Sequence, residues 1–342
     1  MNTQSKVLVI YTGGTIGMVN DPATGALTAF DFGDVYKHIP ELSRLNVTLT
    51  TSAFEHPIDS SEMNPEVWKH IALQIELCYD EYDGFVVLHG SDTMAFTASA
   101  LSFMLQGLNK PIILTGSQLP IGTIRTDGKE NLITAVEIAA AKDNNGNALV
   151  QEVAVYFEYS LYRGNRTTKV SAFSFEAFRS PNYSPLAVAG VHINYSEKLT
   201  KGNGSLRVFT AFDSNVLLLK IFPGMNWNIL SSAISTDHVK GIVLETYGSG
   251  NAASDKAFQE TLQKYIETGG IVLNITQCST GSVEQGKYET SSFFEQNGVL
   301  SGYDLTSEAA ITKMMYAIGI SNGNQSETKR ILQENIAGEM TL

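Results

Sequence analysis

The first segment that could do chemistry is residues 7–17, in which a hydroxyl follows two glycines at the end of an apolar run. Residues 7–11 predict a buried strand, because the run is short and apolar. Gly13 and Gly14 permit a sharp turn and leave space for a ligand beside the backbone, so Thr15 can face that ligand. A hydroxyl in this position is a candidate nucleophile. An ordinary strand exit has the same pattern, so this segment alone leaves both interpretations open.

A second segment, residues 85–94, repeats the pattern. An apolar run is again followed by a glycine, Gly90, and then by Ser91 and Asp92 before a helical pattern begins. In an open α/β sheet, ligands bind beyond the carboxyl ends of the strands. Two strand ends that carry hydroxyls and a carboxylate can therefore converge on one crevice, and a lysine farther along the chain, Lys169, is a candidate base.

These two segments resemble the signature motifs of the L-asparaginase family, T-G-G-T-I-x and H-G-T-D-T, which appear here as residues 12–17 and 89–93. Residues 79–90 and 161–169 resemble the cytoplasmic, type I branch of the bacterial members. The resemblance covers nearly the whole chain. It implies hydrolysis of L-asparagine to L-aspartate and ammonia without a cofactor or metal. It also implies an α/β fold, with a larger N-terminal parallel-sheet domain and a smaller C-terminal α/β domain.

Hydrolysis of a carboxamide requires a nucleophile, a base, donors for the oxyanion and an acid for the departing ammonia. The resemblance makes Thr15 the nucleophile and joins Ser91, Lys169 and Asp92 in a cluster that activates a nucleophile or the deacylating water. A lysine acts as a base only where its surroundings lower its pKa toward neutrality. Spacing alone would favour a solvated lysine at Lys169; the match to the family pattern G-x-x-x-T-K favours the catalytic role.

The resemblance also assigns the groups that bind the substrate. Ser60 is expected to hold the α-carboxylate and Ser61 the amino end, although the same segment fits a plain turn before a helix. Asp92 is expected to bind the α-ammonium group, although a carboxylate at a helix start more often caps the helix. Gly90 and the backbone N–H of Ser91 are candidates for contacts with a carboxylate or an oxyanion at the following helix start.

Three positions depart from the family pattern. Ser91 replaces the usual threonine, which keeps the hydroxyl and loses the methyl group that restricts its rotamer. Ala26 stands about where many bacterial members carry a lid tyrosine, so another phenol has to be sought. Tyr288, in a polar segment after the last predicted strand, is our candidate, and a tyrosine that merely covers the loop is the alternative. Glu245 stands where some members have an arginine of an effector site, which puts allosteric activation in doubt.

Two other side chains near the motifs admit a different reading. His89 could form a relay with Ser91 and Asp92, but adjacent residues of an extended chain point to opposite faces, so a shared hydrogen bond is not expected. No histidine pair has the spacing of a zinc site, and the two cysteines form no cluster. Tyr11 lies on the strand that leads to Thr15, where a core role is expected.

Composition narrows the class of partner. The 342 residues carry a formal net charge of −12, which opposes binding to nucleic acid or an anionic membrane and favours a small substrate. Cys78 and Cys278 lie in patterns typical of buried thiols, which fits a reducing compartment. No secretory signal is expected at the start, and no apolar run approaches the roughly 18 residues of a membrane span. We expect a soluble, cytoplasmic protein, and the resemblance implies a homodimer or a dimer of dimers.

The elements that position these residues follow from the apolar runs. Alternating strands and helical patterns predict a parallel sheet covered by helices in the first two thirds of the chain. One helix is expected to begin at Pro65, after the cap Asn64. The predicted domains are 1–195 and 213–342, joined by a polar linker at 196–212. The predicted strands are 7–11, 47–51, 85–88, 112–115, 153–157, 216–222, 241–246 and 271–276.

Three other functions stay open at this point. A glutaminase-asparaginase of broad specificity would share the catalytic residues, and the rates with the two amides would separate it. A non-catalytic amino-acid sensor could keep Ser60 and Asp92 without releasing ammonia. A phosphate-binding module is disfavoured, because the glycine pair before Thr15 lacks the lysine and spacing of a P-loop.

Overall fold

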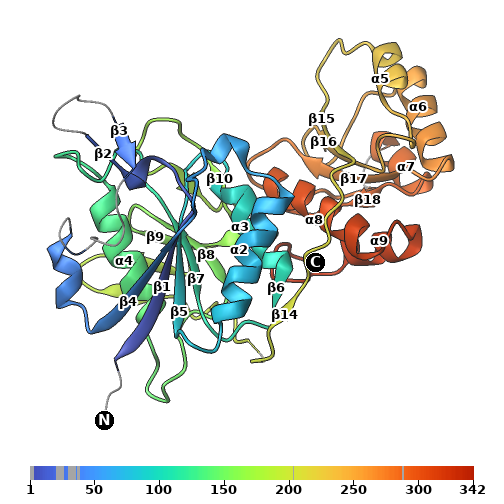
Figure 1. Ribbon diagram of the computed structural model, residues 1–342. Helices are drawn as coiled ribbons and strands as arrows, with labels where there is room; N and C mark the ends of the chain where they lie inside the picture. The colour runs from blue at the N-terminus through green and yellow to red at the C-terminus, as the bar shows by residue number, and fades with distance from the viewer. Residues whose placement is uncertain (1–3, 21–26, 30–35, 37–38, 203, 287–288) are drawn as a thin grey trace. The chain divides into compact units, whose positions relative to one another are not determined.

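The computed structural model describes residues 4–20, 27–29, 36, 39–202, 204–286 and 289–342 (Figure 1). The chain divides into two compact units, Met1–Val208 and Phe209–Leu342. The larger unit holds a mixed sheet and the smaller unit a parallel sheet, each packed with helices. The predicted fold class is confirmed. The change of unit falls inside the stretch 196–212, whose exact bounds as a linker stay a prediction.

The eight strands of the large sheet follow the order β13-β12-β9-β8-β7-β5-β1-β4. Neighbouring strands from β4 to β8 are parallel, as predicted. Every residue of β5, β7 and β8 is buried, because helices cover both faces. The strands are β1 (Ser5–Tyr11), β4 (Val47–Ala53), β5 (Gly84–Leu88), β7 (Ile112–Thr115), β8 (Val153–Phe157), β9 (Ser160–Arg163), β12 (Ala187–Ala189) and β13 (Ile193–Tyr195).

An antiparallel edge formed by β9, β12 and β13 corrects the prediction of a purely parallel sheet. The edge begins at the turn between β8 and β9, where Glu158 and Tyr159 have φ angles of 36° and 66°. A two-residue turn with positive φ at both positions reverses the chain directly. Neither residue is a glycine, so the sequence gives no turn signal at this point.

Three helices cover the large sheet: α2 (Pro65–Cys78), α3 (Met94–Met104) and α4 (Gly128–Ala140). Figure 1 shows α4 on one face and α2 with α3 on the other. The predicted cap is confirmed, since the Asn64 side chain accepts the N–H groups of Glu66 and Val67. Ile71 and Ile75 of α2, one helical turn apart, are both buried.

Shorter elements complete this unit, and several of them carry the loops of the candidate site. They are the 3-10 helices η1 (Thr15–Gly17), η3 (Pro40–Arg44), η4 (Ser60–Glu62) and η5 (Gly164–Arg166), and the strands β2 (Met18–Asn20), β3 (Leu27–Ala29), β6 (Leu105–Gln106), β10 (Thr168–Lys169), β11 (Phe178–Arg179) and β14 (Arg207–Val208).

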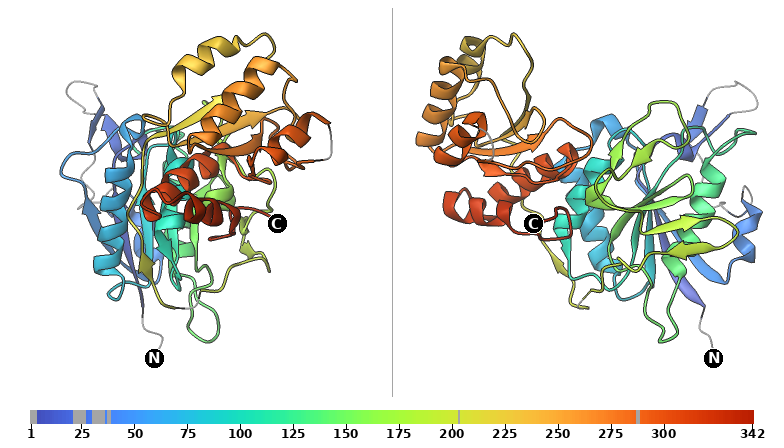
Figure 2. Two further views of the ribbon diagram at one scale, coloured as in Figure 1. Left: turned by 90° about the vertical axis from the view of Figure 1, so that its right-hand side faces the viewer. Right: turned by 180° about the vertical axis from the view of Figure 1, so that it is seen from behind.

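The smaller unit has a four-stranded parallel sheet in the order β15-β16-β17-β18 (Figure 2). Phe258 and Leu262 of α6 are buried, as its apolar spacing predicts. Within the described residues, no helix has both the length and the apolar composition needed to cross a bilayer. The elements are β15 (Val216–Lys220), α5 (Trp227–Ala233), β16 (Gly241–Thr246), α6 (Lys256–Glu267), β17 (Ile271–Thr276), α7 (Glu289–Gln296), β18 (Leu300–Ser301), α8 (Ser307–Ile320) and α9 (Gln325–Gln333).

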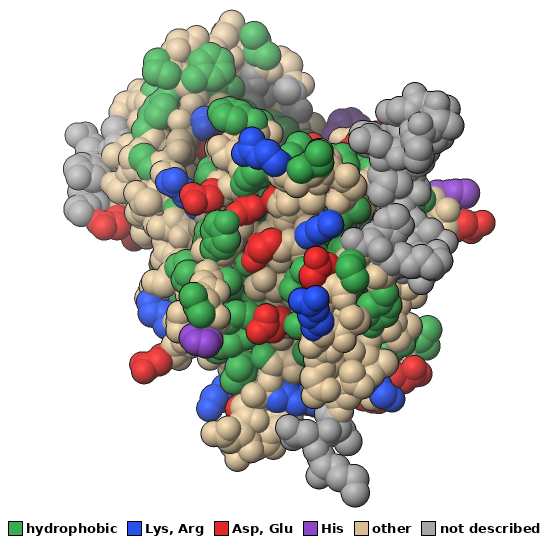
Figure 3. Space-filling model, turned by 90° about the vertical axis from the view of Figure 1, so that its left-hand side faces the viewer, with side chains coloured by type: hydrophobic (Ala, Val, Ile, Leu, Met, Phe, Trp, Pro, Cys, Tyr) green, Lys and Arg blue, Asp and Glu red, His purple; other side chains and the backbone are tan. Residues whose placement is uncertain are grey.

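The surface drawn in Figure 3 mixes acidic and basic side chains among apolar and polar ones. The described residues on this face form no continuous basic patch of the kind that tracks a phosphate backbone. This distribution agrees with the overall acidic charge of the chain.

Candidate active site

Two glycines bring the chain after β1 against the chain after β5. Gly13 and Gly14 have φ angles of 136° and 87°, a region that favours glycine. A Cβ at Gly13 would lie 2.1 Å from the carbonyl oxygen of Ile58, and one at Gly14 would lie 2.5 Å from the Cα of Gly90. The backbones therefore touch without intervening side chains. Thr15 follows directly, as the first residue of η1.

A cavity of about 330 Å³ opens at this crossing. Five of the predicted site residues line it, from three separate loops: Thr15, Ser60, Gly90, Ser91 and Asp92. The convergence of two strand ends expected from the sequence is thus present in the structure. Ligand cavities of enzymes begin at about 300 Å³, so the volume fits a small molecule.

Lys169 joins Ser91 and Asp92 in the cluster that the resemblance implies. Its Nζ donates to the Ser91 Oγ at 2.8 Å and to the Asp92 Oδ1 at 2.7 Å. The Lys169 side chain is 15% exposed, whereas that of Asp92 is 72% exposed. β10 holds the lysine in place by pairing with β11, with Lys169 opposite Phe178. A solvated loop lysine is therefore excluded.

Asp92 does not cap the helix that follows it. The N-cap of α3 is Thr93, and no side chain makes a capping hydrogen bond there. The Thr93 hydroxyl instead donates to the backbone carbonyl of Ser60 at 2.6 Å, which ties the β5 loop to η4. The Asp92 carboxylate is thus directed at Lys169 and the cavity.

The loop that carries the expected substrate contacts also contains a residue that the sequence did not single out. Ser60 is buried, whereas Ser61 is exposed and turns its hydroxyl to the Asp59 carboxylate at 2.8 Å. Asp59 lines the cavity, and the Ser61 N–H and hydroxyl lower its pKa below the usual value. Two carboxylates, Asp59 and Asp92, therefore border the cavity. The likeness to the family's substrate loop gave roles to Ser60 and Ser61 only, and no role was predicted for Asp59.

Comparison with known proteins decides the family. Residues 6–201 match the family described as Asparaginase, N-terminal, and residues 215–332 match the Glutaminase/Asparaginase C-terminal domain. The chain is 41% identical to L-asparaginase 1 of Escherichia coli (strain K12), over 99% of this chain and 98% of that protein. The chain belongs to the asparaginase family. The family predicted from the two motifs is thereby confirmed.

Solved structures of asparaginases share the fold over the full length. The crystal structure of L-asparaginase I from Vibrio cholerae O1 biovar eltor str. N16961 has a TM-score of 0.89 at 37% identity, covering 99% of this chain and 100% of that one. The thermostable L-asparaginase from Thermococcus kodakarensis also has a TM-score of 0.89, at 32% identity, covering 98% of this chain and 99% of that one.

Of the two tyrosines considered in the sequence, the structure describes only Tyr11. Tyr288, our candidate for the missing lid phenol, and Ala26 lie outside the described residues. Tyr11 is buried, as predicted, but it also lines the cavity, which the sequence did not indicate. Its hydroxyl donates to the carbonyl of Gly17 at 3.3 Å, and burial raises the pKa of Tyr11 to about 12. The neutral Tyr11 phenol therefore stabilises the turn that contains Thr15 through this hydrogen bond.

Glu245, the departure noted in the second unit, is a buried carboxylate at the next-to-last position of β16. Lys220 Nζ lies 3.5 Å from its Oε2, and the Ser307 hydroxyl donates to its Oε1. These groups satisfy the carboxylate locally.

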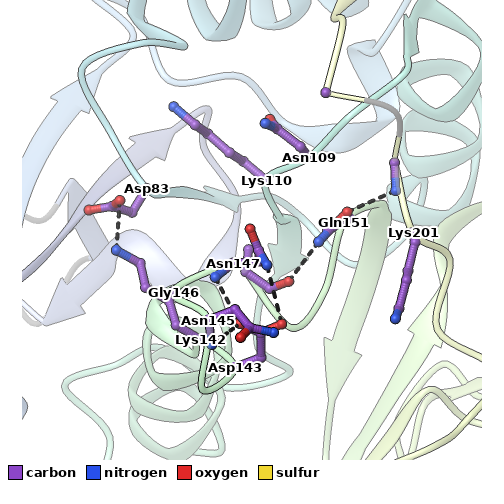
Figure 4. A pocket seen from close by; sticks show the side chains of 13 residues that line it. Asp83, Asn109, Lys110, Lys142, Asp143, Asn145, Gly146, Asn147, Gln151 and Lys201 are labelled. Atoms are coloured by element: carbon purple, nitrogen blue, oxygen red, sulfur yellow. Dashed lines mark hydrogen bonds and ion pairs between the residues drawn. The ribbon is translucent and has the colours of Figure 1, made fainter.

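A larger cavity, of about 500 Å³, lies at the opposite end of the large sheet, beside the starts of β5 and β7 (Figure 4). Its polar groups are bonded to one another. Lys142 Nζ donates to Asp83 at 2.9 Å, and the Asn147 N–H donates to Asp143 at 2.9 Å. No predicted site residue lines it. The smaller cavity is therefore the candidate active site, although its volume is lower.

Proposed function

We propose that the protein is an L-asparaginase that hydrolyses L-asparagine to L-aspartate and ammonia. The observation that supports this most is a small cavity lined by Thr15, Ser91 and Asp92, in which the last two side chains are hydrogen-bonded to Lys169. Such a set supplies a nucleophile, a second hydroxyl and a proton-transferring group at one place.

In the proposed reaction, the Thr15 hydroxyl attacks the side-chain carboxamide carbon of asparagine. Backbone N–H donors stabilise the oxyanion, and the proton from Thr15 reaches the nitrogen, which leaves as ammonia. This leaves an aspartyl ester on Thr15. A water then attacks the ester with help from the Ser91, Lys169 and Asp92 cluster. Its hydroxyl completes L-aspartate, and its proton returns to Thr15.

The proposed substrate contacts use both ends of the amino acid. Ser60 holds the α-carboxylate, and Ser61 contributes at the amino end. Asp92 binds the α-ammonium group, with Asp59 as a second carboxylate at the same cavity. Gly90 and the Ser91 N–H contact a carboxylate or the oxyanion. Fixing both α-groups sets how far the carboxamide reaches toward Thr15.

Ammonia release with L-asparagine, L-glutamine and D-asparagine tests the proposal. We expect rapid ammonia and L-aspartate production from L-asparagine and much slower release from the other two. Equal rates with L-asparagine and L-glutamine would instead support a glutaminase-asparaginase. Saturable binding of asparagine without any ammonia would support an amino-acid sensor.

We further propose a cytoplasmic homodimer or dimer of dimers that acts on a small substrate and binds neither nucleic acid nor membrane. Cys78 is half-buried and Cys278 is exposed, which corrects the expectation of a buried thiol at Cys278. Both thiols are free, and together with the net charge of −12 they support the compartment and the choice of ligand. Light scattering after size-exclusion chromatography measures the assembly. A monomer at micromolar concentration would contradict this part of the proposal.

A further inference from the structure

His89 is a buried histidine that the proposed reaction does not use. It directly follows β5, and its N–H donates to the Thr115 carbonyl at 2.9 Å, so its backbone still belongs to the sheet. The residue has 0% exposure. Its ring makes hydrogen bonds to Thr97 and to Gly90, which excludes a relay to Ser91 and agrees with the sequence analysis. The ring therefore cannot exchange protons with substrate.

A chain of hydrogen bonds fixes which ring nitrogen carries the proton. The Trp68 indole can only donate, and its Nε1 lies 3.0 Å from the Thr97 Oγ1. The Gly90 carbonyl oxygen can only accept and lies 2.6 Å from Nδ1, so the proton of the neutral ring is on Nδ1. Nε2 is then an acceptor, and the Thr97 hydroxyl, which accepts from Trp68, donates to it at 2.8 Å. Burial lowers the pKa of His89 to about 4, so the ring stays neutral at neutral pH.

The Gly90 carbonyl belongs to the peptide that supplies the Ser91 N–H. The peptide is trans, so its C=O and N–H point in opposite directions. A carbonyl held by the buried ring therefore turns the Ser91 N–H away from the ring. Gly90 and Ser91 both line the cavity.

Gly90 cannot be fixed by a side chain of its own. A Cβ at this position would lie 2.6 Å from the Ser60 Oγ, so only glycine fits. Glycine also has the widest range of backbone angles, so the peptide needs an external restraint. The His89 ring supplies one.

We propose that His89 is a positioning residue, whose Nδ1–H holds the Gly90 carbonyl so that the Ser91 N–H and hydroxyl face the substrate. Trp68 and Thr97 hold the ring in the donating tautomer. This inference rests on the proposed amidohydrolase function. A purely structural histidine would make the same contacts, but its replacement would change activity only as far as it changed folding.

Two amide variants separate these roles. In His89→Asn the side-chain amide nitrogen takes the approximate place of Nδ1 and keeps the donor to Gly90, but it loses the bond to Thr97. In His89→Gln the amide reaches the place of Nε2 and loses the donor to Gly90. Both are polar, uncharged and similar in size, so their melting temperatures serve as the matched control.

The measured quantity is kcat/KM for L-asparagine at matched folded protein. We expect His89→Gln to fall roughly tenfold to a hundredfold below His89→Asn, because a misplaced contact of about 1 Å costs on that order. Equal kcat/KM for the two variants, or values that follow their melting temperatures, would overturn the inference.

Thr97 gives a second test if neither histidine variant folds. Thr97→Val removes the hydroxyl that fixes the tautomer, and Thr97→Ser restores it. We expect a loss of kcat/KM of several-fold to tenfold in Thr97→Val and rescue in Thr97→Ser. Equal kcat/KM in the two would overturn the proposal. Wild type that releases no ammonia would refute the proposed function itself, whereas active wild type with indifferent variants would refute only the role of His89.

Discussion

Each unit contains a lysine whose Nζ lies 2.7 Å from a carboxylate oxygen, yet the two pairs have different surroundings. Lys313 and Glu339, in the smaller unit, both have 0% side-chain exposure. Lys313 also donates to the carbonyl of Leu332 at 3.0 Å. Lys169, in the larger unit, instead donates both to Asp92, which is mostly exposed, and to the Ser91 hydroxyl.

The difference shows how an ion pair serves structure or chemistry. Glu339 also accepts the N–H groups of Ile336 and Ala337, and Lys313 also donates to the Glu334 carbonyl, so both charged groups are saturated by the fold. A saturated pair has no capacity left for a ligand. In the Lys169 pair, Asp92 lines a cavity, and Lys169 also donates to the Ser91 hydroxyl, which lines the same cavity. The first pair should therefore govern stability and the second turnover.

The largest expected effect is on turnover and comes from the proposed nucleophile beside the Lys169 pair. Thr15→Ala should lower kcat by roughly a thousandfold or more, because it removes the proposed nucleophilic oxygen. The melting temperature should stay unchanged, since a loop hydroxyl contributes little packing. Thr15→Ser, which keeps a hydroxyl, is the matched control. More than a few per cent of wild-type kcat in Thr15→Ala would rule out Thr15 as nucleophile.

Replacing each lysine by methionine tests the comparison directly, because methionine keeps an apolar side chain of similar length and removes the charge. Lys169→Met should lose roughly a hundredfold to ten-thousandfold in kcat, with unfolding free energy near wild type. Lys313→Met should lose about 3–5 kcal/mol of unfolding free energy, because Glu339 stays buried without its partner. Its folded fraction should keep wild-type kcat.

Ammonia release and urea unfolding measure the two quantities. Adding Glu339→Gln to Lys313→Met should recover much of the lost stability, since the unpaired charge is removed. If both lysine variants lost mainly kcat, or both lost mainly unfolding free energy, the assignment of one pair to structure and the other to chemistry would be contradicted.

A smaller effect concerns the length of the substrate. In the proposed binding mode Ser60 and Asp92 fix the α-groups, so the extra methylene of L-glutamine would move its carboxamide away from Thr15. We expect kcat/KM for L-glutamine to be about a hundredfold below that for L-asparagine, as a displacement of about 1 Å can produce. Equal values for the two amides would contradict this geometry.

The smallest effect concerns a carboxylate whose neighbours are other carboxylates. Burial, with contributions from Glu130, Asp127 and Glu176, raises the pKa of Glu158 from 4.5 to about 7. The native state therefore binds a proton more tightly than the unfolded state, and this stabilisation is lost as pH rises from 4.5 through 7.

Glu158→Gln should thus raise the melting temperature relative to wild type at pH 8 and lose that advantage near pH 4.5. Thermal unfolding of both proteins across this range measures the difference. An advantage that does not depend on pH would show that Glu158 is not ionised against its neighbours.

The sequence predicted those parts of the site that depend on local pattern. Glycines after apolar runs, a pair at Gly13 and Gly14 and a single one at Gly90, identified the two strand ends, and Thr15 and Ser91 followed from them. Lys169 could not be placed by spacing, because it reaches Asp92 across 77 residues of chain. Only the likeness to a known motif favoured its role.

Other features depend on contacts that leave no local signal. The turn at Glu158 and Tyr159 has positive φ without a glycine, so the antiparallel edge was missed. Lys313 lies on a helix with mostly apolar neighbours, and its partner Glu339 comes from a separate segment near the end of the chain. Tertiary packing brings these two charges together, and the sequence periodicity of either segment does not predict the ion pair.

The central claim is that Thr15 forms a covalent ester with the aspartyl group of the substrate. Rapid acid quenching of the enzyme during turnover of L-asparagine, followed by digestion and mass spectrometry, tests it directly. Lys169→Met serves as a second sample, because slower deacylation should accumulate the ester. We predict an aspartyl adduct on the peptide that contains Thr15, and none in Thr15→Ala. An adduct on the peptide that contains Ser91 would contradict the account.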